Sequence, residues 1–387
     1  MRITCVHQGY ELYGSDRSFI ESVEAIRAGF PDAQIDVVLP RHGPIEALLH
    51  GAASRIVIEP VWVLRRRDLL RLLTRDLLRL PRAILRAFKR MKYSDLVYLN
   101  TTVLADYMLA ARFRPGRAII HVHELPQGAV LAILRACIRW SKAEVIFNSQ
   151  SSRSAFDLPA SVISGVIYNG VAGPPRAEPM TYDGSRPLRL LMLGRISRIK
   201  GQEVLIEALA RLDVAMRPEV RIVGSAFEDP QREAQLATMI QDAGLDKTVS
   251  LQPFVADPAS LYRWADVVAV PSRLPESLGR VAIEAMAFGR PPVASAIGGL
   301  VEVVADGKTG WLVEPGSATA LAAALEVLIE NPASWASFPE AGRARYDALF
   351  SEAVASHAIQ ARLRTMLESR PGLVRVSTPS DASGRAA

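Results

Sequence analysis

The chain has 387 residues, of which 49% are hydrophobic, and its formal net charge is +6. This length predicts about two domains, and the apolar fraction excludes global disorder. Cys5 and Cys137 are too few for a disulfide framework or a cysteine zinc site, so a reducing cytosol is the expected compartment. The sequence shows no signal peptide, and its apolar runs are far shorter than the roughly 20 residues of a membrane-spanning helix.

Short β-branched apolar runs alternate with longer helical patterns in the first part of the chain. The predicted strands are 3–7, 35–39, 55–58, 96–99, 118–123, 145–148 and 162–168, with helices such as 18–28 and 129–141 between them. This alternation is typical of a parallel sheet that helices cover on both faces. Residues 1–175 are therefore expected to form one α/β domain.

A stretch rich in Pro, Gly and polar residues predicts a linker at 176–187, after which the same alternation resumes. The predicted strands of this part are 188–193, 220–223, 249–251, 267–270, 292–295 and 311–313, and its predicted helices are 202–212, 231–243, 281–287, 318–330 and 351–367. Residues 188–368 thus predict a second α/β domain, and 369–387 a disordered tail. The carboxyl ends of two such sheets are expected to face a shared ligand cleft.

The most informative pattern is a pair of glutamates, Glu276 and Glu284, around a predicted helix start. Gly279 permits a tight turn, and the helix that begins near Arg280 and Val281 exposes backbone N–H groups and the positive end of its dipole, which bind phosphate. A carboxylate on each side can accept hydrogen bonds from sugar hydroxyls. The pattern therefore favours a sugar–diphosphate–nucleoside, and the alternative is that Glu276 caps the helix while Glu284 is a surface residue.

The residues around this pair carry a resemblance to a known family. Glu276 and Glu284 enclose seven residues, and this E-x7-E pattern, with the block 285–313 that follows it, is similar to the C-terminal signature of glycosyltransferase family 4 (group 1 glycosyltransferases). A second block, 194–201, resembles that family's G-R-x4-K-G loop. The resemblance is strong over 188–315 and weaker over 1–175.

The resemblance implies the GT-B fold, in which two Rossmann-like, doubly wound parallel-sheet domains face a central cleft. Residues 1–175 would be the acceptor-side domain. Residues 188–368, including the C-terminal helix, would be the domain that binds the nucleotide sugar.

Arg195 and Lys200 follow the first predicted strand of the second domain and precede a helix. Cations near a helix start can hold a diphosphate, and the alternative is a solvated basic loop. The resemblance implies that both neutralise the leaving nucleoside diphosphate, so no metal or other cofactor is expected. The sequence has no Asp-x-Asp motif or clustered His/Asp set suited to a metal.

His121 and His123 lie at a predicted strand end, where the alternation of side chains places them on one face. A lone strand-end histidine is more often structural than catalytic. The resemblance implies a histidine here that hydrogen-bonds the donor sugar, and we choose His123, with His121 as the alternative. The role of Glu124 stays open.

A glycine-containing loop follows the first predicted strand. Ser15, where a phosphate-binding P-loop has Lys, follows Gly14 and excludes that motif. The resemblance implies that Gly14 lies where donor phosphate and acceptor meet, and the alternative is a simple strand-to-helix turn. Asn169 opens an N-G-V sequence that we interpret as another turn.

Residues 65–92 hold 11 basic and 2 acidic residues, more than the whole positive excess of the chain. Their apolar residues are spaced by three or four, and Pro81 interrupts this helical stripe, so two helices are expected. The segment is either a solvated cationic face or an interfacial helix on an anionic membrane surface. Nucleic acid is not expected as a partner, because no nucleic-acid module accompanies the charge.

Together these features and the resemblance, which implies retention of the anomeric configuration without a metal, predict a hexosyltransferase that moves a sugar from a nucleotide sugar, UDP- or GDP-linked, to a hydroxyl of a lipid-linked or polysaccharide acceptor. The expected location is the cytoplasm, peripheral on the inner face of the plasma membrane. Two alternatives remain, a nucleotide-sugar epimerase of the same fold and a non-catalytic module that binds nucleotide sugar or membrane.

Overall fold

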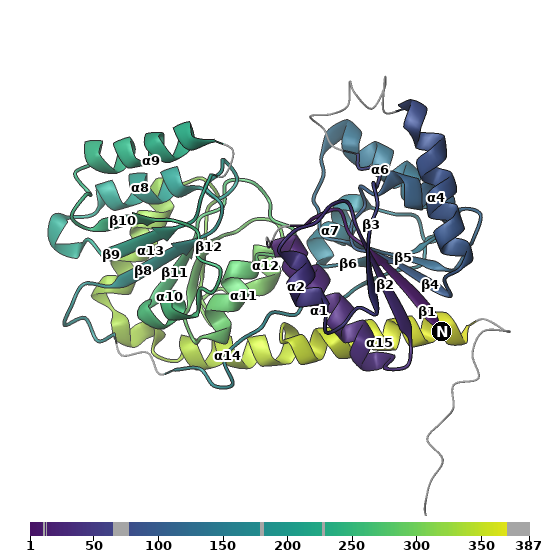
Figure 1. The fold of residues 1–387 in the computed structure, drawn as a ribbon. Helices are drawn as coiled ribbons and strands as arrows, with labels where there is room; N and C mark the ends of the chain where they lie inside the picture. Colours follow the sequence, from purple (N-terminus) through teal and green to yellow (C-terminus); the bar gives the residue numbers. More distant parts are fainter. Residues whose placement is uncertain (11, 13, 65–76, 179–181, 227–228, 370–387) are drawn as a thin grey trace, which may run out of the picture.

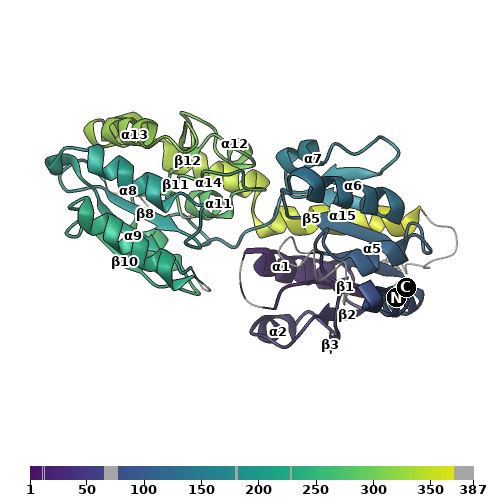
Figure 2. The ribbon, with the colours of Figure 1, turned by 90° about the horizontal axis from the view of Figure 1, so that it is seen from above.

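The computed structural model describes residues 1–10, 12, 14–64, 77–178, 182–226 and 229–369. Across these residues two parallel sheets form the centres of two α/β domains that lie side by side (Figures 1 and 2). The strand order is β3-β2-β1-β4-β5-β6-β7 in the first sheet and β10-β9-β8-β11-β12-β13 in the second. In each sheet the order reverses beside the first strand, which is the point where doubly wound folds bind ligands. The prediction of two Rossmann-like domains is confirmed.

The strands coincide with the short apolar runs of the sequence, because both faces of a parallel sheet are buried. The first sheet contains β1 (Arg2–Val6), β2 (Gln34–Leu39), β3 (Arg55–Ile58), β4 (Leu96–Leu99), β5 (Ala118–Val122), β6 (Glu144–Phe147) and β7 (Ser164–Val166). The second contains β8 (Arg189–Leu193), β9 (Glu219–Val223), β10 (Val249–Gln252), β11 (Val267–Val270), β12 (Pro292–Ser295) and β13 (Trp311–Val313).

Helices cover both sheets. In the first domain they are α1 (Gly14–Gly29), α2 (Ile45–Leu49), α4 (Leu80–Lys92), α5 (Ala105–Ala111), α6 (Gly128–Ser141) and α7 (Gln150–Phe156). The later helices are α8 (Gln202–Arg211), α9 (Pro230–Asp242), α10 (Ala259–Trp264), α11 (Arg280–Ala287), α12 (Leu300–Val303), α13 (Ala318–Glu330), α14 (Phe338–Leu349) and α15 (Glu352–Glu368). Among the described residues, none of these helices is long and apolar enough to cross a membrane.

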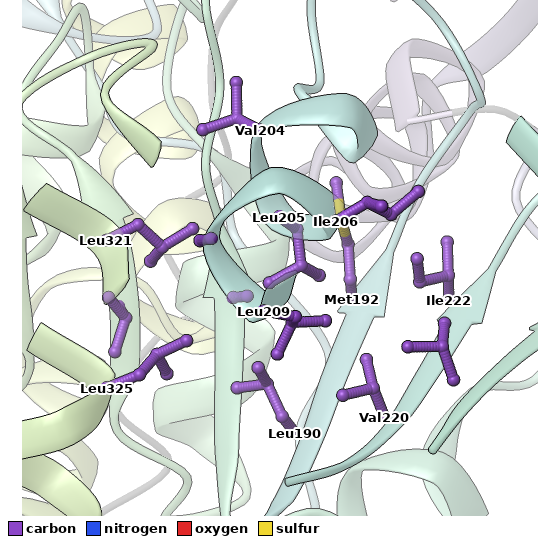
Figure 3. Close-up of a cluster of buried hydrophobic side chains, with 14 of the residues drawn as sticks. Leu190, Met192, Val204, Leu205, Ile206, Leu209, Val220, Ile222, Leu321 and Leu325 are labelled. Carbon is purple, nitrogen blue, oxygen red and sulfur yellow. The ribbon is translucent and has the colours of Figure 1, made fainter. Parts of the chain in front are cut away.

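The second sheet packs against α8 and α13 through a dry core (Figure 3). Leu190 and Met192 of β8 and Leu205 and Leu209 of α8 are almost completely buried there. Replacing one such leucine by alanine costs about 2–5 kcal/mol, so this core holds the carboxyl end of β8 and the loop after it in a fixed place.

The last helix corrects the predicted domain boundary. We assigned α15 to the second domain, but its buried residues Ile359, Leu363 and Met366 belong to the core of the first domain, together with Phe19 of α1. Figure 1 shows the chain crossing back beneath both domains through α14 and α15. Periodicity predicts that α15 is amphipathic, but it does not reveal which domain its apolar face covers.

The predicted linker is only partly a free connection. Tyr182 stacks on Trp335 and Arg186 forms an ion pair with Asp266 at 2.6 Å, so residues 182–187 pack on the second domain. The first part of the basic segment, 65–76, and nearly all of the predicted tail, 370–387, lie outside the described residues. The described remainder of the basic segment forms a short 3₁₀ helix, Leu77–Arg79, and α4, and Pro81 lies in the first turn of α4, where proline is tolerated.

Candidate functional site

Loops at the carboxyl ends of both sheets line one cleft of about 520 Å³ between the domains. All predicted catalytic and donor-binding residues line it: Gly14, His123, Arg195, Lys200, Glu276, Gly279, Arg280, Val281 and Glu284. Side chains far apart in the sequence therefore meet, because parallel strands end at the same edge of a sheet. Their shared location is an observation, whereas their chemical roles remain predictions.

Glu276 and Lys200 form an ion pair within the second domain. Lys200 Nζ donates to Glu276 Oε2 at 2.7 Å, and the hydroxyl of Ser272 donates to Glu276 Oε1. Burial raises the pKa of Glu276, but the charge of Lys200 and these two hydrogen bonds outweigh it, so the pKa lies below its ordinary value. Glu276 is therefore an ionised acceptor at neutral pH. The ammonium group of Lys200 has three donors, so it can also bind an anion.

A tight turn at a glycine places the first residues of α11 at the cleft. Gly279 has φ +96°, and a Cβ there would lie 2.4 Å from Leu300 Cδ2, so only glycine fits. The helix starts at Arg280, and Gly279, Arg280 and Val281 all border the cleft. Backbone N–H groups without an intrahelical acceptor and the positive end of the dipole gather at such a start, which is thus suited to a phosphate.

The loop that carries Arg195 and Lys200 is fixed against the same wall. Gly201, the N-cap residue before α8, has φ +76°, and a Cβ there would lie 2.0 Å from the carbonyl oxygen of Pro271, just beyond β11. Gln202 Nε2 donates to the carbonyl of Arg195 at 3.1 Å. This close approach places Lys200 beside Glu276, and Arg195 borders the same cleft.

Glu284 is held at both carboxylate oxygens. Tyr262 donates to Oε2 at 2.6 Å and Arg280 Nε donates to Oε1 at 2.8 Å. Each oxygen keeps a lone pair, so the carboxylate can still accept hydrogen bonds from vicinal hydroxyls.

The guanidinium group of Arg280 also reaches the other domain. Its Nη2 and Nη1 donate to the two oxygens of Glu21 on α1, at 2.6 and 3.1 Å. Burial raises the pKa of Glu21 to about 7, although the charge of Arg280 opposes this shift. Arg280 therefore links the Glu284 end of the cleft to the first domain.

His123 follows β5 and borders the cleft. Its Nε2 lies 3.0 Å from Asn100 Oδ1, and its Nδ1 lies 3.2 Å from Asn169 Nδ2. These partners assign the proton to Nε2 and leave Nδ1 as the acceptor. Burial and the neighbouring imidazoles of His121 and His7 hold the pKa of His123 well below its usual range, so its ring is neutral at neutral pH.

His121 shares a sheet face with His123, as the alternation predicts, and their ring centroids are 4.1 Å apart. It lies outside the cleft, however, because it is buried beside a separate pocket between α1 and α15 and contacts the hydroxyl of Tyr98. Burial lowers the pKa of His121 to about 3. Glu124 accepts hydrogen bonds from the hydroxyls of Thr101 and Thr102, so it braces the loop after β4.

The sequence analysis missed Asn169 as a cleft residue, and it missed two residues that hydrogen-bond to cleft residues, Glu21 and Tyr262. Asn169, interpreted as part of a turn, lines the cleft and donates to both His123 and Ser18. Glu21 and Tyr262 lie within ordinary amphipathic helices, where no local pattern distinguishes them from surface residues. Among the described residues, no group of three or more His, Cys, Asp or Glu is arranged to hold a metal ion.

Comparison with known families identifies the second domain. Residues 184–345 match the family model described as "Glycosyl transferases group 1". A D-inositol 3-phosphate glycosyltransferase of Arthrobacter sp. (strain FB24) is 39% identical over 166 residues, which are 41% of this chain and 38% of that protein. The enzyme of the same name from Nocardioides sp. (strain ATCC BAA-499 / JS614) is 43% identical over 162 residues, 37% of this chain and 34% of that protein. The chain thus spans less than two fifths of the length of these relatives.

Comparison with solved structures covers nearly the whole chain. Anabaena HepE in complex with UDP is 25% identical and superimposes with a TM-score of 0.78 over 94% of this chain and 100% of that one. Sucrose-phosphate synthase from Thermosynechococcus elongatus, 21% identical with a TM-score of 0.75 over 95% and 100% of the two chains, shares the fold. The chain therefore has the GT-B fold. Its residues 184–345 match the group 1 glycosyltransferase model, the family that the sequence resemblance names.

Proposed function

We propose that this chain is a retaining glycosyltransferase that takes its sugar from a nucleotide sugar bound in the cleft. The observation that carries the proposal is the convergence of one anion site and two acceptor carboxylates. Lys200, Arg195, Glu276, Glu284 and the start of α11 all line the same cleft. A diphosphate fits the cations and the helix start, and the carboxylates then accept hydrogen bonds from the sugar and the ribose.

UDP-sugar is the first candidate donor and GDP-sugar the second. HepE, which has the same fold, has been solved with UDP and with UDP and glucose. In this chain Glu276 would bind the transferred hexose, and Glu284, anchored by Tyr262 and Arg280, would bind the ribose.

The proposed chemistry needs positioning and charge stabilisation more than a protein nucleophile. The acceptor oxygen forms a bond to the anomeric carbon on the face from which the diphosphate oxygen departs. The acceptor proton passes to that leaving diphosphate, whose charge Lys200 and Arg195 stabilise. Neutral His123 donates from Nε2 in its present hydrogen bond, and a sugar hydroxyl could replace Asn100 as its partner. We propose that the reaction needs no metal.

The acceptor is proposed to be a lipid-linked or polysaccharide hydroxyl bound mainly by the first domain. A second candidate is an inositol phosphate, because the curated relatives are named for that acceptor. We place the enzyme in the cytoplasm, peripheral on the inner face of the plasma membrane. Exposed Leu85 lies among the exposed or half-buried cations of α4, as on an interfacial helix. Co-sedimentation with anionic but not zwitterionic vesicles, weakened by salt, tests this location.

Two assays test the function. In a thermal-shift screen of UDP-, GDP-, ADP- and dTDP-sugars, a true donor raises the melting temperature, because it binds only the folded state. Nuclear magnetic resonance of the product formed from that donor and a candidate acceptor should show the donor's anomeric configuration. An epimerised free sugar formed without acceptor would replace the proposal by the epimerase alternative. Binding without turnover of any pair would favour the non-catalytic module.

A further inference from the structure

A second basic pocket, of about 240 Å³, lies at the amino ends of the first sheet. This is the edge opposite to the proposed donor cleft, beside α4, which faces away from the second domain in Figure 1. Among the described residues, its charged lining consists of Arg2, Arg55, Arg86, Lys89 and Arg90 against a single carboxylate, Asp36. Such an excess of cations around a hollow favours an anionic ligand.

The polar floor of this pocket follows from strand register. Thr4 of β1 pairs with Asp36 of β2, and Asp36 pairs with Arg55 of β3, so the three residues form a row on one sheet face. Two residues further along, on the same face, Val6 and Val38 are buried in the core below α4. The sheet face is therefore apolar near its carboxyl end and polar near its amino end.

Two carboxylates, buried Asp36 and half-buried Glu59, hold two guanidinium groups in place at this pocket. Asp36 is only 2% exposed, and Arg55 Nη2 lies 2.6 Å from its Oδ2. Arg90 Nη1 lies 3.8 Å from the same oxygen, and its Nη2 lies 2.9 Å from Glu59 Oε2. Positioned arginines can bind an oxyanion with little further loss of side-chain entropy.

Two hydroxyls complete the floor. The side chains of Thr4 and Ser94 are buried, line the pocket and hydrogen-bond each other at 2.8 Å. Ser94 Oγ also donates to the carbonyl oxygen of Arg90 at 2.9 Å, so Thr4 is the donor of this pair, and its hydroxyl can rotate to donate to an anion instead. The pocket thus combines positioned guanidinium groups with a neutral donor, as suits a phosphate site.

We propose that this pocket binds the phosphate group of a small molecule or headgroup. The site is separate from the nucleotide-sugar cleft. Its volume is below the roughly 300–1,000 Å³ of pockets for drug-sized ligands, so it suits one compact oxyanion and not a nucleotide. Arg86 and Lys89 of α4 supply further charge at its rim. The phosphate comes from a lipid headgroup or from a soluble phosphate compound.

Calorimetry with inorganic phosphate on the full chain tests the site. The titration contains saturating UDP, which occupies the proposed donor cleft, so any heat of phosphate binding comes from elsewhere on the protein. We expect saturable binding that the Arg86→Gln/Lys89→Gln variant weakens at least about tenfold, because hydrogen bonds to charged groups are lost. The matched control is Arg82→Gln/Lys92→Gln, which removes the same charge from exposed positions of α4 outside the pocket and should bind as wild type.

Absence of saturable phosphate binding, or equal weakening in both variants, would overturn the proposal, because the second result would show only general charge attraction. Circular dichroism should show that both variants fold. Vesicles of phosphatidic acid in phosphatidylcholine then identify the source. Binding lost only in the Arg86→Gln/Lys89→Gln variant supports the site with a lipid headgroup as ligand. If the site binds inorganic phosphate but the two variants bind vesicles equally well, the site is supported and its natural ligand is a soluble phosphate compound.

Discussion

Glu276 is held by Lys200 and Ser272 of its own domain, whereas Glu284 is tied through Arg280 to Glu21 of the other domain. A movement of one domain relative to the other would leave intact the hydrogen bonds of Glu276 and those that Tyr262 and Arg280 donate to Glu284, but it would break the Arg280–Glu21 pair. The Glu276 end of the proposed donor site is therefore preformed within the second domain. The Glu284 end is coupled, through Arg280, to the position of the first domain.

Loss of the cations at the preformed end should have the largest effect. We expect Lys200→Ala, and likewise Arg195→Ala, to lower turnover by about 10²–10³, the usual effect of removing one donor to a developing anion. Steady-state kinetics with the donor found by thermal shift measure this effect. Lys308→Ala, at an exposed lysine elsewhere in the same domain, is the control. Near-normal turnover in both cleft variants would refute the diphosphate assignment.

Loss of the coupled carboxylate should affect binding more than chemistry. Glu284→Ala should weaken nucleotide affinity by about 10–100-fold, because hydrogen bonds to a charged group are worth about 1.5–3 kcal/mol each. Glu284→Gln should weaken it less, since an amide oxygen still accepts. Calorimetry with the nucleotide measures both variants, and unchanged affinity in Glu284→Ala would count against the ribose role.

The link between the domains should depend on pH. The pKa of Glu21 rises from 4.5 to about 7 on folding, so between these values the folded chain holds the extra proton. Its contribution to the unfolding free energy is complete below pH 4.5 and is lost as pH rises through 7. Relative to Glu21→Gln, wild type should therefore lose roughly 2–3 kcal/mol between pH 5 and pH 8. Denaturant titrations at both values measure this difference, and a pH-independent difference would disprove the assignment.

A second contact between the domains should have the smallest effect. Glu302 accepts hydrogen bonds from the backbone N–H groups of Gln150, at 2.7 Å, and Ser151 at the start of α7. Glu302→Gln removes the charge that favours this helix end, and we expect it to cost about 0.5–1 kcal/mol. A lowered melting temperature of Glu302→Gln, with turnover equal to that of wild type, would support this expectation. A loss of turnover as large as that of Lys200→Ala would show that the two ends of the cleft are not separately held.

The same comparison explains what could be predicted from the sequence. The preformed end is encoded locally, because Lys200, Glu276 and Gly279 lie in loops that immediately follow strands and carry family motifs. Their meeting in one cleft follows from parallel-sheet topology. The strand runs were also predictable, since both faces of a parallel sheet demand apolar residues.

The coupled end could not be predicted in this way. The contact between Glu21 and Arg280 joins residues 259 positions apart, and α15 covers the first domain although it follows the second in sequence. Such contacts depend on how two folded domains pack against each other. The spacing of residues within either segment does not reveal that packing. The proposed phosphate pocket arises similarly, from the register of three strands and one helix.

The central claim is that a nucleoside diphosphate binds at the start of α11 between two cations and two carboxylates. A crystal structure of the chain with UDP tests it most directly. We predict the diphosphate within hydrogen-bond distance of Lys200 Nζ and the backbone N–H of Val281, with the ribose hydroxyls on Glu284. UDP bound away from these residues would contradict the account.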